Sequence, residues 1–222
     1  MASEQELRTQ LVAAIQRLFS SGVMSRSGHG NMSARLPGTD HMLLASTGGG
    51  SMPTAESIPV VTLDGEVVSG QLDPTTREIV AMHAGVYRVR DDVGSVMHTH
   101  SPQVTSFAVA NKDLPCVYEA FLRFGILEDI PVAAWAPRGS KESVTNIVEQ
   151  LEKHPGIPAV LLGNHGLLAF ARDPLATAQL IIIMEEAAEL TLNARTLGGE
   201  QEFPADALER ERTHMRQFGS MH

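Results

Sequence analysis

Apolar and polar positions along the chain fall into segments of helical and of strand spacing. The first segment opens with Ser3 and Glu6, a pair that predicts a capping box at a helix start. Four apolar residues then recur every three or four positions: Leu7, Leu11, Ile15 and Leu18. Because this interval places side chains on one face of a helix, the pattern predicts an amphipathic helix that Gly22 can close.

Short apolar runs separated by turn residues make up much of the remaining pattern. They predict strands at residues 31–36, 42–46, 59–63, 66–68, 93–98, 130–135, 158–162 and 167–171. Helical spacing returns at residues 74–90, 101–110, 140–152, 173–197 and from about 204 onward. This interleaved order predicts an α/β fold, a three-layer α/β/α sandwich around a central mixed, largely antiparallel sheet.

Composition narrows the classes of protein that this pattern fits. The 222 residues suit a single domain over 1–222, since one α/β core serves about 200–250 residues. A hydrophobic fraction of 43% is typical of a globular chain, and the net charge of −9 disfavours a nucleic-acid partner, which needs a basic face. With one cysteine, Cys116, and no recognisable signal or membrane-spanning segment, we expect a cytoplasmic protein without a membrane partner.

Three of the nine histidines stand where predicted strands end. His98 and His100 are two residues apart at the end of a strand, so their side chains point to the same side. His165 lies in a Gly-Asn-His-Gly turn directly after another apolar strand. Three imidazoles with an open fourth position suit a catalytic Zn²⁺ site, and Mn²⁺, Co²⁺, Ni²⁺ and Fe²⁺ accept similar ligands. The alternative is that each histidine has an ordinary structural role.

Polar, glycine-rich turns provide a second candidate constellation. Two of them occupy residues 30–33 and 46–50, and Thr75 and Thr76 lie in the first turn of a predicted helix. Backbone amides at such turns and at a helix start attract anions, so these segments predict a cradle for a phosphate or carboxylate. Ordinary turn chemistry is the alternative for each segment taken singly.

Four sequence blocks together carry a resemblance to a known family. They are GHGNMSAR (28–35), STGGG (46–50), PTTREIVAMHAGVYRVRDDVGSVMHTHSP (74–102) and AVLLGNHGLLAFARDPLATA (159–178). In this order they resemble the class II aldolase/adducin family, of the fuculose-phosphate aldolase and ribulose-phosphate epimerase type. The similarity runs from the first helix to about Arg195.

The resemblance implies a site and an assembly. It implies an α/β/α sandwich that assembles as a homotetramer and acts on a small molecule, with active sites between neighbouring subunits. It implies one divalent metal, often zinc, on His98, His100 and His165. It also implies a phosphate cradle at the positions of five residues: Asn31, Thr47, Gly48, Thr75 and Thr76. His29 is expected to border the substrate; it and the triple glycine depart from the sugar-phosphate enzymes, so a carboxylate is an alternative occupant.

Two glutamates mark further departures from the family pattern. Sugar-phosphate aldolases carry a glutamate directly after their Ser/Thr pair, whereas here Arg77 follows Thr76 and the glutamate is Glu78. Glu78 is a candidate catalytic or metal-binding carboxylate, or a first-turn residue favoured by the helix dipole. Glu119 occupies the place of the aldolase tyrosine that reaches across the subunit interface. It is a candidate proton shuttle, with a solvated glutamate on an amphipathic helix as the alternative.

The chemistry predicted from these features is that of a metal-dependent carbon–carbon lyase. We expect aldol-type cleavage of a small hydroxy-carbonyl compound through a metal-stabilised enediolate or enolate. Three alternatives use the same residues: decarboxylation of a hydroxy acid, epimerisation of a sugar phosphate, and its dehydration. An aromatic acid would need a ring pocket, for which Phe121, Phe124 and Trp135 are candidates. An adducin-like binding module is the alternative outside enzymology, although such members lack the metal histidines.

Overall fold

The computed structural model describes residues 2–49 and 51–218, without the side chains of Thr75 and residues 215–218. The helices are α1 (Glu4–Ser20), α2 (Arg77–Val89), α3 (Pro102–Ala110), α4 (Glu119–Arg123), α5 (Lys141–Lys153), α6 (Pro174–Thr196) and α7 (Ala207–Phe218). The strands are β1 (Gly30–Arg35), β2 (His41–Thr47), β3 (Val60–Thr62), β4 (Val67–Ser69), β5 (Ser95–Thr99), β6 (Val132–Ala133), β7 (Ala159–Leu162) and β8 (Gly166–Ala171). Gly50, the last residue of the predicted turn at 46–50, lies outside the described residues.

The strands form one eight-stranded sheet in the order β4-β3-β2-β1-β5-β8-β7-β6. Neighbours are antiparallel except β6 and β7, which run parallel. The predicted mixed, largely antiparallel sheet is therefore confirmed. Because β5 sits between β1 and β8, segments far apart in the sequence lie side by side at the centre of the sheet.

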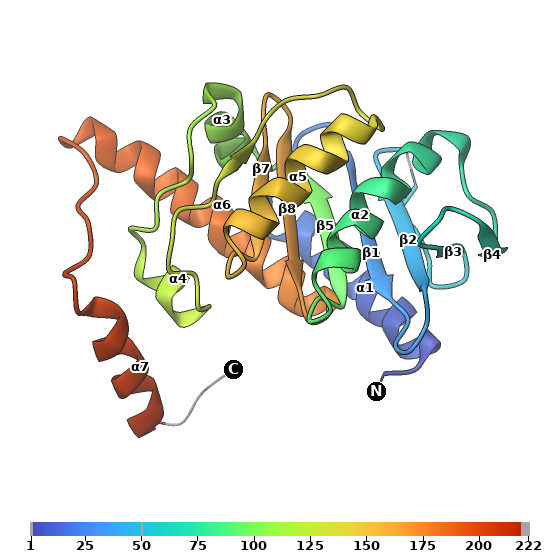
Figure 1. The fold of residues 1–222 in the computed structure, drawn as a ribbon, viewed down its shortest axis with the longest axis horizontal. Coiled ribbons are helices and arrows are strands. Elements are labelled where there is room, and N and C mark those ends of the chain that lie inside the picture. The colour runs from blue at the N-terminus through green and yellow to red at the C-terminus, as the bar shows by residue number, and fades with distance from the viewer. Residues whose placement is uncertain (1, 50, 219–222) are drawn as a thin grey trace.

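Helices cover both faces of this sheet (Figure 1). On one face α1, α3 and α6 pack together and against the sheet, around a cluster that includes Leu11, Phe107 and Ile181. On the other face α2 and α5 pack together over a second cluster, which includes Tyr87 and Ile147. Two apolar clusters separated by a sheet constitute the three-layer α/β/α sandwich that the sequence predicts.

Local signals account for the starts of several helices. Ser3 caps α1 in a capping box with Glu6, and the Asp173 side chain accepts a hydrogen bond from the Ala176 N–H at the start of α6. The helix predicted at 74–90 instead begins as a 3₁₀ turn, Pro74–Thr76, and continues as α2 from Arg77. This shift places Glu78 in the first turn of α2.

Two segments differ from the sequence expectation. The strand predicted at 130–135 is reduced to the two residues of β6. Pro131 has no N–H for a ladder, and the Val132 N–H donates to Asp113 rather than to a strand. Helix α4, which the sequence suggested only as the alternative setting for Glu119, packs beside α7, away from the centre of the sheet (Figure 1).

None of the helices in the described part of the chain is both long and apolar enough to cross a membrane.

Candidate metal centre

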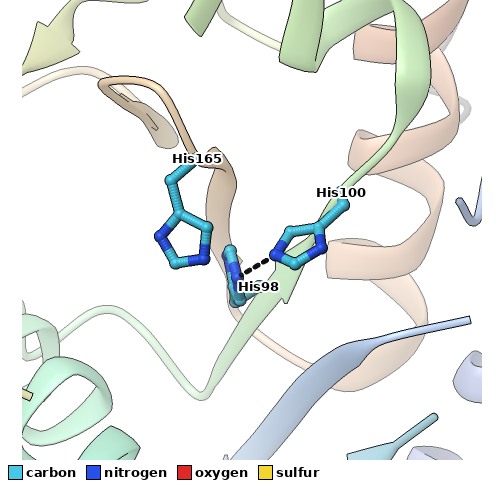
Figure 2. Close-up of side chains that lie close together, drawn as sticks. All are labelled: His98, His100 and His165. Carbon is cyan, nitrogen blue, oxygen red and sulfur yellow. Dashed lines mark hydrogen bonds between the residues drawn. The ribbon is translucent and has the colours of Figure 1, made fainter. Parts of the chain in front are cut away.

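The three predicted histidine ligands converge where the central strand β5 ends. His98 belongs to β5, His100 follows that strand, and His165 lies in the turn between β7 and β8. Because β5 pairs with β8 over Ser95–Thr99, the β7–β8 turn is brought to the end of β5. Figure 2 shows the three rings facing one another. The structure therefore assembles the site from segments about 65 residues apart in the chain.

The geometry suits a bound cation. His98 Nδ1 lies 2.9 Å from the carbonyl oxygen of Leu167, and a carbonyl can only accept, so Nδ1 carries the hydrogen. The other nitrogen, Nε2, then has a lone pair that can bind a metal, and it lies 3.0 Å from His100 Nε2 inside the cluster (Figure 2). One nitrogen from each of the three rings lies within 4.8 Å of the others.

The environment keeps these rings neutral. Burial lowers the pKa of His98 well below its usual value, and the neighbouring His165 and His100 lower it further. The pKa of His100 falls to about 4, chiefly through burial and then through His165. Burial and Arg138 also lower the pKa of His165. Neutral imidazole is the form that binds metal, so the electrostatics favour ligation near neutral pH.

Backbone packing is tight where the β7–β8 turn meets the end of β5. A Cβ atom added at Gly166 would lie 2.5 Å from the Thr99 carbonyl oxygen and 3.2 Å from His98 Cε1. The turn before it is tight, because Asn164 adopts a left-handed conformation with φ of 56° and the His165 N–H donates to Leu162. The glycine next to His165 thus allows the two strands to approach closely enough for the rings to meet.

A donor set of three neutral imidazoles fits a divalent ion with at least one coordination position free. Such an ion would polarise a carbonyl oxygen and stabilise negative charge that develops beside it. Two features of the site fit such an ion: His98 has its Nδ1 held by Leu167 and its Nε2 toward the cluster, and the three rings converge. The identity of the ion does not follow from imidazole ligands alone.

A cavity adjoins the cluster, with all three histidines in its lining. Much of the remaining wall is apolar, and six residues account for the larger side chains: Ile79, Met82, Trp135, Val144, Ile147 and Leu162. His29, Glu78 and Arg138 add polar groups to the same lining. Arg138 Nε lies 3.5 Å from Glu78 Oε2, and both side chains are exposed. The cavity therefore combines a candidate metal, an ion pair and an apolar wall.

The predicted cradle residues have mixed surroundings. Asn31 is 8% exposed and pairs with His98 across β1 and β5, so their side chains share a face of the sheet. Thr47 is buried and donates its hydroxyl hydrogen to the Gly28 carbonyl oxygen at 2.7 Å. Gly48 has φ of 96°, and a Cβ there would lie 2.6 Å from the ring of His29.

Thr76 and Thr75 complete the predicted cradle. The buried Thr76 hydroxyl lies 3.4 Å from that of Ser46, which joins the start of α2 to the end of β2. Thr75 lies in the 3₁₀ turn before α2. Both residues directly precede α2, and backbone amides at a helix start attract anions.

Glu119 is outside this cavity within one chain. It is the first residue of α4, and its carboxylate accepts from Arg123 Nη2 at 2.5 Å on the protein surface. The pKa of its neighbour Tyr118 is raised, first by burial and then by the nearby Glu186. A role for Glu119 in this site requires a second copy of the chain.

The sequence analysis did not identify one residue of the cavity, Arg138, and two of its three candidate aromatics lie elsewhere. Arg138 was not identified; its only signal is a cation in the Pro-Arg-Gly-Ser loop before α5. Of the three candidate ring-pocket aromatics, Trp135 lines the cavity, whereas Phe121 is fully buried in the core and Phe124 packs against that core.

Comparison with known proteins decides the family. The family described as "Class II Aldolase and Adducin N-terminal domain" matches residues 9–192. The chain belongs to the class II aldolase and adducin family. This match includes all three histidines, strand β5 and the turn between β7 and β8, so the resemblance found in the sequence is confirmed.

Curated relatives of similar length are aldolases. A 5-deoxy-D-ribulose 1-phosphate aldolase of Bacillus thuringiensis serovar kurstaki is 28% identical over 92% of this chain and 93% of its own. A 5-methylthioribulose-1-phosphate/5-deoxyribulose-1-phosphate aldolase of Rhodospirillum rubrum is 28% identical over 96% and 92%. Among solved structures, an L-fuculose 1-phosphate aldolase aligns with a TM-score of 0.82 and 26% identity, over 97% of this chain and 98% of the other.

These findings bear on the expected chemistry. Together they support an aldol-type carbon–carbon lyase, as the sequence predicts. Class II aldolases depend on a divalent metal, and the three-histidine cluster provides the matching donors. The relatives imply a small-molecule substrate.

Proposed function

We propose that this class II aldolase-family enzyme cleaves a phosphorylated ketose whose end opposite the phosphate is apolar. The observation that carries the proposal is the cavity, in which the candidate metal ligands face an apolar wall that includes Met82 and Ile147. A hydroxylated chain end placed against that wall loses hydrogen bonds to water without gaining partners. The two curated relatives named above act on deoxy or methylthio sugars, which agrees with this choice.

The proposed reaction is a retro-aldol cleavage. For a 2-ketose 1-phosphate, the bond between C3 and C4 breaks, the C4 hydroxyl loses its proton, and C3 gains one. The products are dihydroxyacetone phosphate and an aldehyde, so the atoms balance without any further reactant. A divalent metal on the three histidines would stabilise the negative charge at the carbonyl of the three-carbon fragment.

Residues of this chain supply binding and proton transfer in the proposal. Asn31 and the amides around Gly48, Thr75 and Thr76 hold the phosphate at the loops and helix start. Glu78 lies in the cavity wall, where its carboxylate can hold a proton while Arg138 fixes its orientation through their ion pair. His29, stacked against Gly48, borders the substrate.

The second proton carrier in the proposal is Glu119 from a neighbouring copy. Its exposed carboxylate lies at the start of α4, available to a partner surface, and it is absent from the cavity of its own chain. We therefore infer a homotetramer in which each active site lies between two subunits, each built on residues 1–222. Light scattering after size exclusion tests the assembly, and a monomer would contradict it.

Exchange of the proton carrier tests this assignment. We expect Glu119→Gln to lower kcat about a hundredfold while metal content stays unchanged, because general acid–base catalysis contributes roughly 10²–10⁴-fold. Glu152→Gln, on the exposed side of α5, is the matched control and should behave as wild type. Wild-type turnover in the Glu119→Gln enzyme would make Glu119 a solvated surface residue.

A substrate panel tests the reaction itself. We expect 5-deoxyribulose 1-phosphate to be cleaved with a higher kcat/KM than ribulose 1-phosphate, with dihydroxyacetone phosphate measured directly. A removed hydroxyl against an apolar wall is worth about 1–3 kcal/mol, or about 5- to 150-fold. Equal rates would contradict the apolar-end assignment, and no cleavage of any phosphorylated ketose would contradict the function.

The metal and the remaining chemistries are read from the same preparation. We propose zinc as the resident ion, so elemental analysis should find about one zinc per chain, and a chelator should abolish turnover. A phosphate-free hydroxy acid that releases carbon dioxide would establish the decarboxylase alternative, for which Arg138 provides a carboxylate partner. A protein that binds no divalent ion would support an adducin-like binding role.

A further inference from the structure

A chain of buried polar side chains lies between β1 and α2, beside the metal centre. Asn31 and Ser33 are two residues apart on β1, so they share one face, and α2 presents His83 and Tyr87 to them. His83 Nε2 lies 2.6 Å from Asn31 Oδ1, and its Nδ1 lies 2.7 Å from Ser33 Oγ. Ser33 Oγ in turn lies 2.7 Å from the Tyr87 hydroxyl.

Burial separates these residues into one that a ligand can touch and three that it cannot. Ser33, His83 and Tyr87 are fully buried, whereas Asn31 retains an exposed fraction of 8%. Asn31 also pairs with His98 across the β1–β5 ladder, which puts its side chain next to a metal ligand. Of these residues, Asn31 is therefore the one through which His83 can act on a substrate by direct contact.

The donor and acceptor roles along this row of buried side chains follow from the chemistry of each group. Burial lowers the pKa of His83 to about 3, so near neutral pH the ring has one N–H and one bare nitrogen. The oxygen of the Asn31 amide accepts only, so His83 Nε2 donates to it and Nδ1 accepts from the Ser33 hydroxyl. The Ser33 oxygen then accepts from Tyr87, which completes a run of donors that ends at Asn31.

The end of this run determines which group of Asn31 is left for a ligand. Its carbonyl oxygen is occupied by His83, so the amide NH₂ is the group that remains for a ligand. An NH₂ group donates to a phosphate or carboxylate oxygen, whereas the flipped amide would present an oxygen and repel the same anion. Holding the amide in one orientation removes the free-energy cost of selecting it when substrate binds.

We propose that His83 is a positioning residue that holds the Asn31 amide with its NH₂ group toward the substrate anion. Ser33 acts with it by donating to Nδ1, which fixes the ring as the Nε2–H tautomer. The inference rests on the proposed function in one respect, namely that Asn31 contacts the anionic group of the substrate. It assigns a role to His83 and Ser33, two fully buried residues outside the histidine cluster.

The tautomer is tested without any enzymatic assay. Long-range ¹H–¹⁵N spectra of histidine-labelled full-length protein distinguish Nε2–H from Nδ1–H imidazole, and His83→Gln identifies the signal of this ring. We expect Nε2–H, with the pattern unchanged when inorganic phosphate is added. An Nδ1–H ring would require the Asn31 amide to donate to His83, and that result overturns the proposal even for a fully active enzyme.

The functional effect is tested with two substitutions at the same position. His83→Leu removes both hydrogen bonds, and we expect the KM of the phosphorylated ketose to rise about tenfold, the scale of one hydrogen bond to a charged group. We expect kcat and metal content to stay within twofold of wild type. His83→Gln keeps a donor and an acceptor, so it should restore a KM near wild type.

A double substitution separates positioning from general damage. In an Asn31→Ala background, His83→Leu should change KM less than twofold, because the group it positions is gone. An equal rise in KM in both backgrounds would overturn the proposal. If His83→Leu does not fold by circular dichroism, the Gln variant, the tautomer and phosphate affinity by calorimetry still decide the question. Phosphate affinity also replaces KM if wild type cleaves no ketose, so failure of the proposed function is recognised separately.

Discussion

The three histidines of the candidate metal centre and the single buried His83, which forms the second group, have opposite relations to their surroundings. His98, His100 and His165 meet at the end of β5, where one nitrogen of each ring faces the others and a cavity. His83 lies under α2 with both ring nitrogens engaged, by Asn31 and by Ser33. Burial lowers the pKa in both groups, so a lowered pKa does not distinguish them.

The difference lies in the free lone pairs. His98 uses Nδ1 to donate to Leu167 and keeps Nε2 for a ligand, whereas His83 has no nitrogen left. A histidine becomes a metal ligand when one nitrogen is held by the protein and the other is left free at a cavity. The same residue type, equally buried, becomes part of a hydrogen-bonded support when both are held.

The largest effect should come from removing a ring of the metal group. We expect His100→Ala to lower turnover more than about a hundredfold and to reduce bound metal, since loss of even an outer partner costs about 10- to 100-fold. Thermal unfolding should change little, because the side chain is only partly buried. His41→Ala, paired with Asp40 on the surface, is the control. Full turnover with stoichiometric metal would remove His100 from the ligand set.

A methyl group between the strands should disturb the metal group without touching its donors. In Gly166→Ala the new Cβ would lie 2.5 Å from the Thr99 carbonyl oxygen, so the β5–β8 pairing has to shift. We expect the free energy of unfolding to fall by about 1–3 kcal/mol, with weakened metal binding in calorimetry. At Gly156 the nearest atom to a new Cβ is 3.8 Å away, so Gly156→Ala should unfold as wild type. Equal stability of both variants would contradict this packing.

Acid should destabilise the fold through the buried ring of the second group. The pKa of His83 is about 3 in the folded chain against an ordinary 6.5, so the unfolded chain binds more protons between these values. Stability is therefore greatest above about pH 6.5 and falls as the pH drops toward 3, by up to about 1.4 kcal/mol per unit. Urea unfolding across this range should be less steep in pH for His83→Gln. Parallel curves would show that His83 is charged or exposed.

The smallest effect should come from the far end of the buried run. Tyr87→Phe removes one donor to Ser33, yet the Ser33 hydroxyl can still donate to His83. We expect a loss of about 1 kcal/mol in denaturant unfolding, with KM and the His83 tautomer unchanged. A rise in KM as large as that of His83→Leu would extend the support as far as Tyr87.

Much of the fold was predictable because its signals are local. The capping box of Ser3 and Glu6, the Asp173–Pro174 start of α6 and the apolar strands on either side of His165 all formed as predicted. The short length of β6 and the bounds of α4 were not, since both depend on contacts with distant segments rather than on their own periodicity.

The candidate site divides along the same line. The metal histidines were identifiable because they stand at strand ends and in a glycine turn, which are sequence features. Arg138 and the Asn31–His83 contact were not, because a loop cation and a helix histidine have no distinctive spacing. The roles of Glu78, Glu119 and the cradle residues stay predictions.

The sequence by itself determined the family, the layered α/β/α fold and the identity of the three candidate ligands. These follow from periodicity, from turn chemistry and from motif order, each of which involves residues close together in the chain. The tertiary structure alone decided which nitrogen of His98 the protein holds, and what lies around the cluster. The reason is physical: hydrogen-bond partners such as Leu167 for His98, and Asn31 for His83, come from distant segments that meet only when the sheet forms.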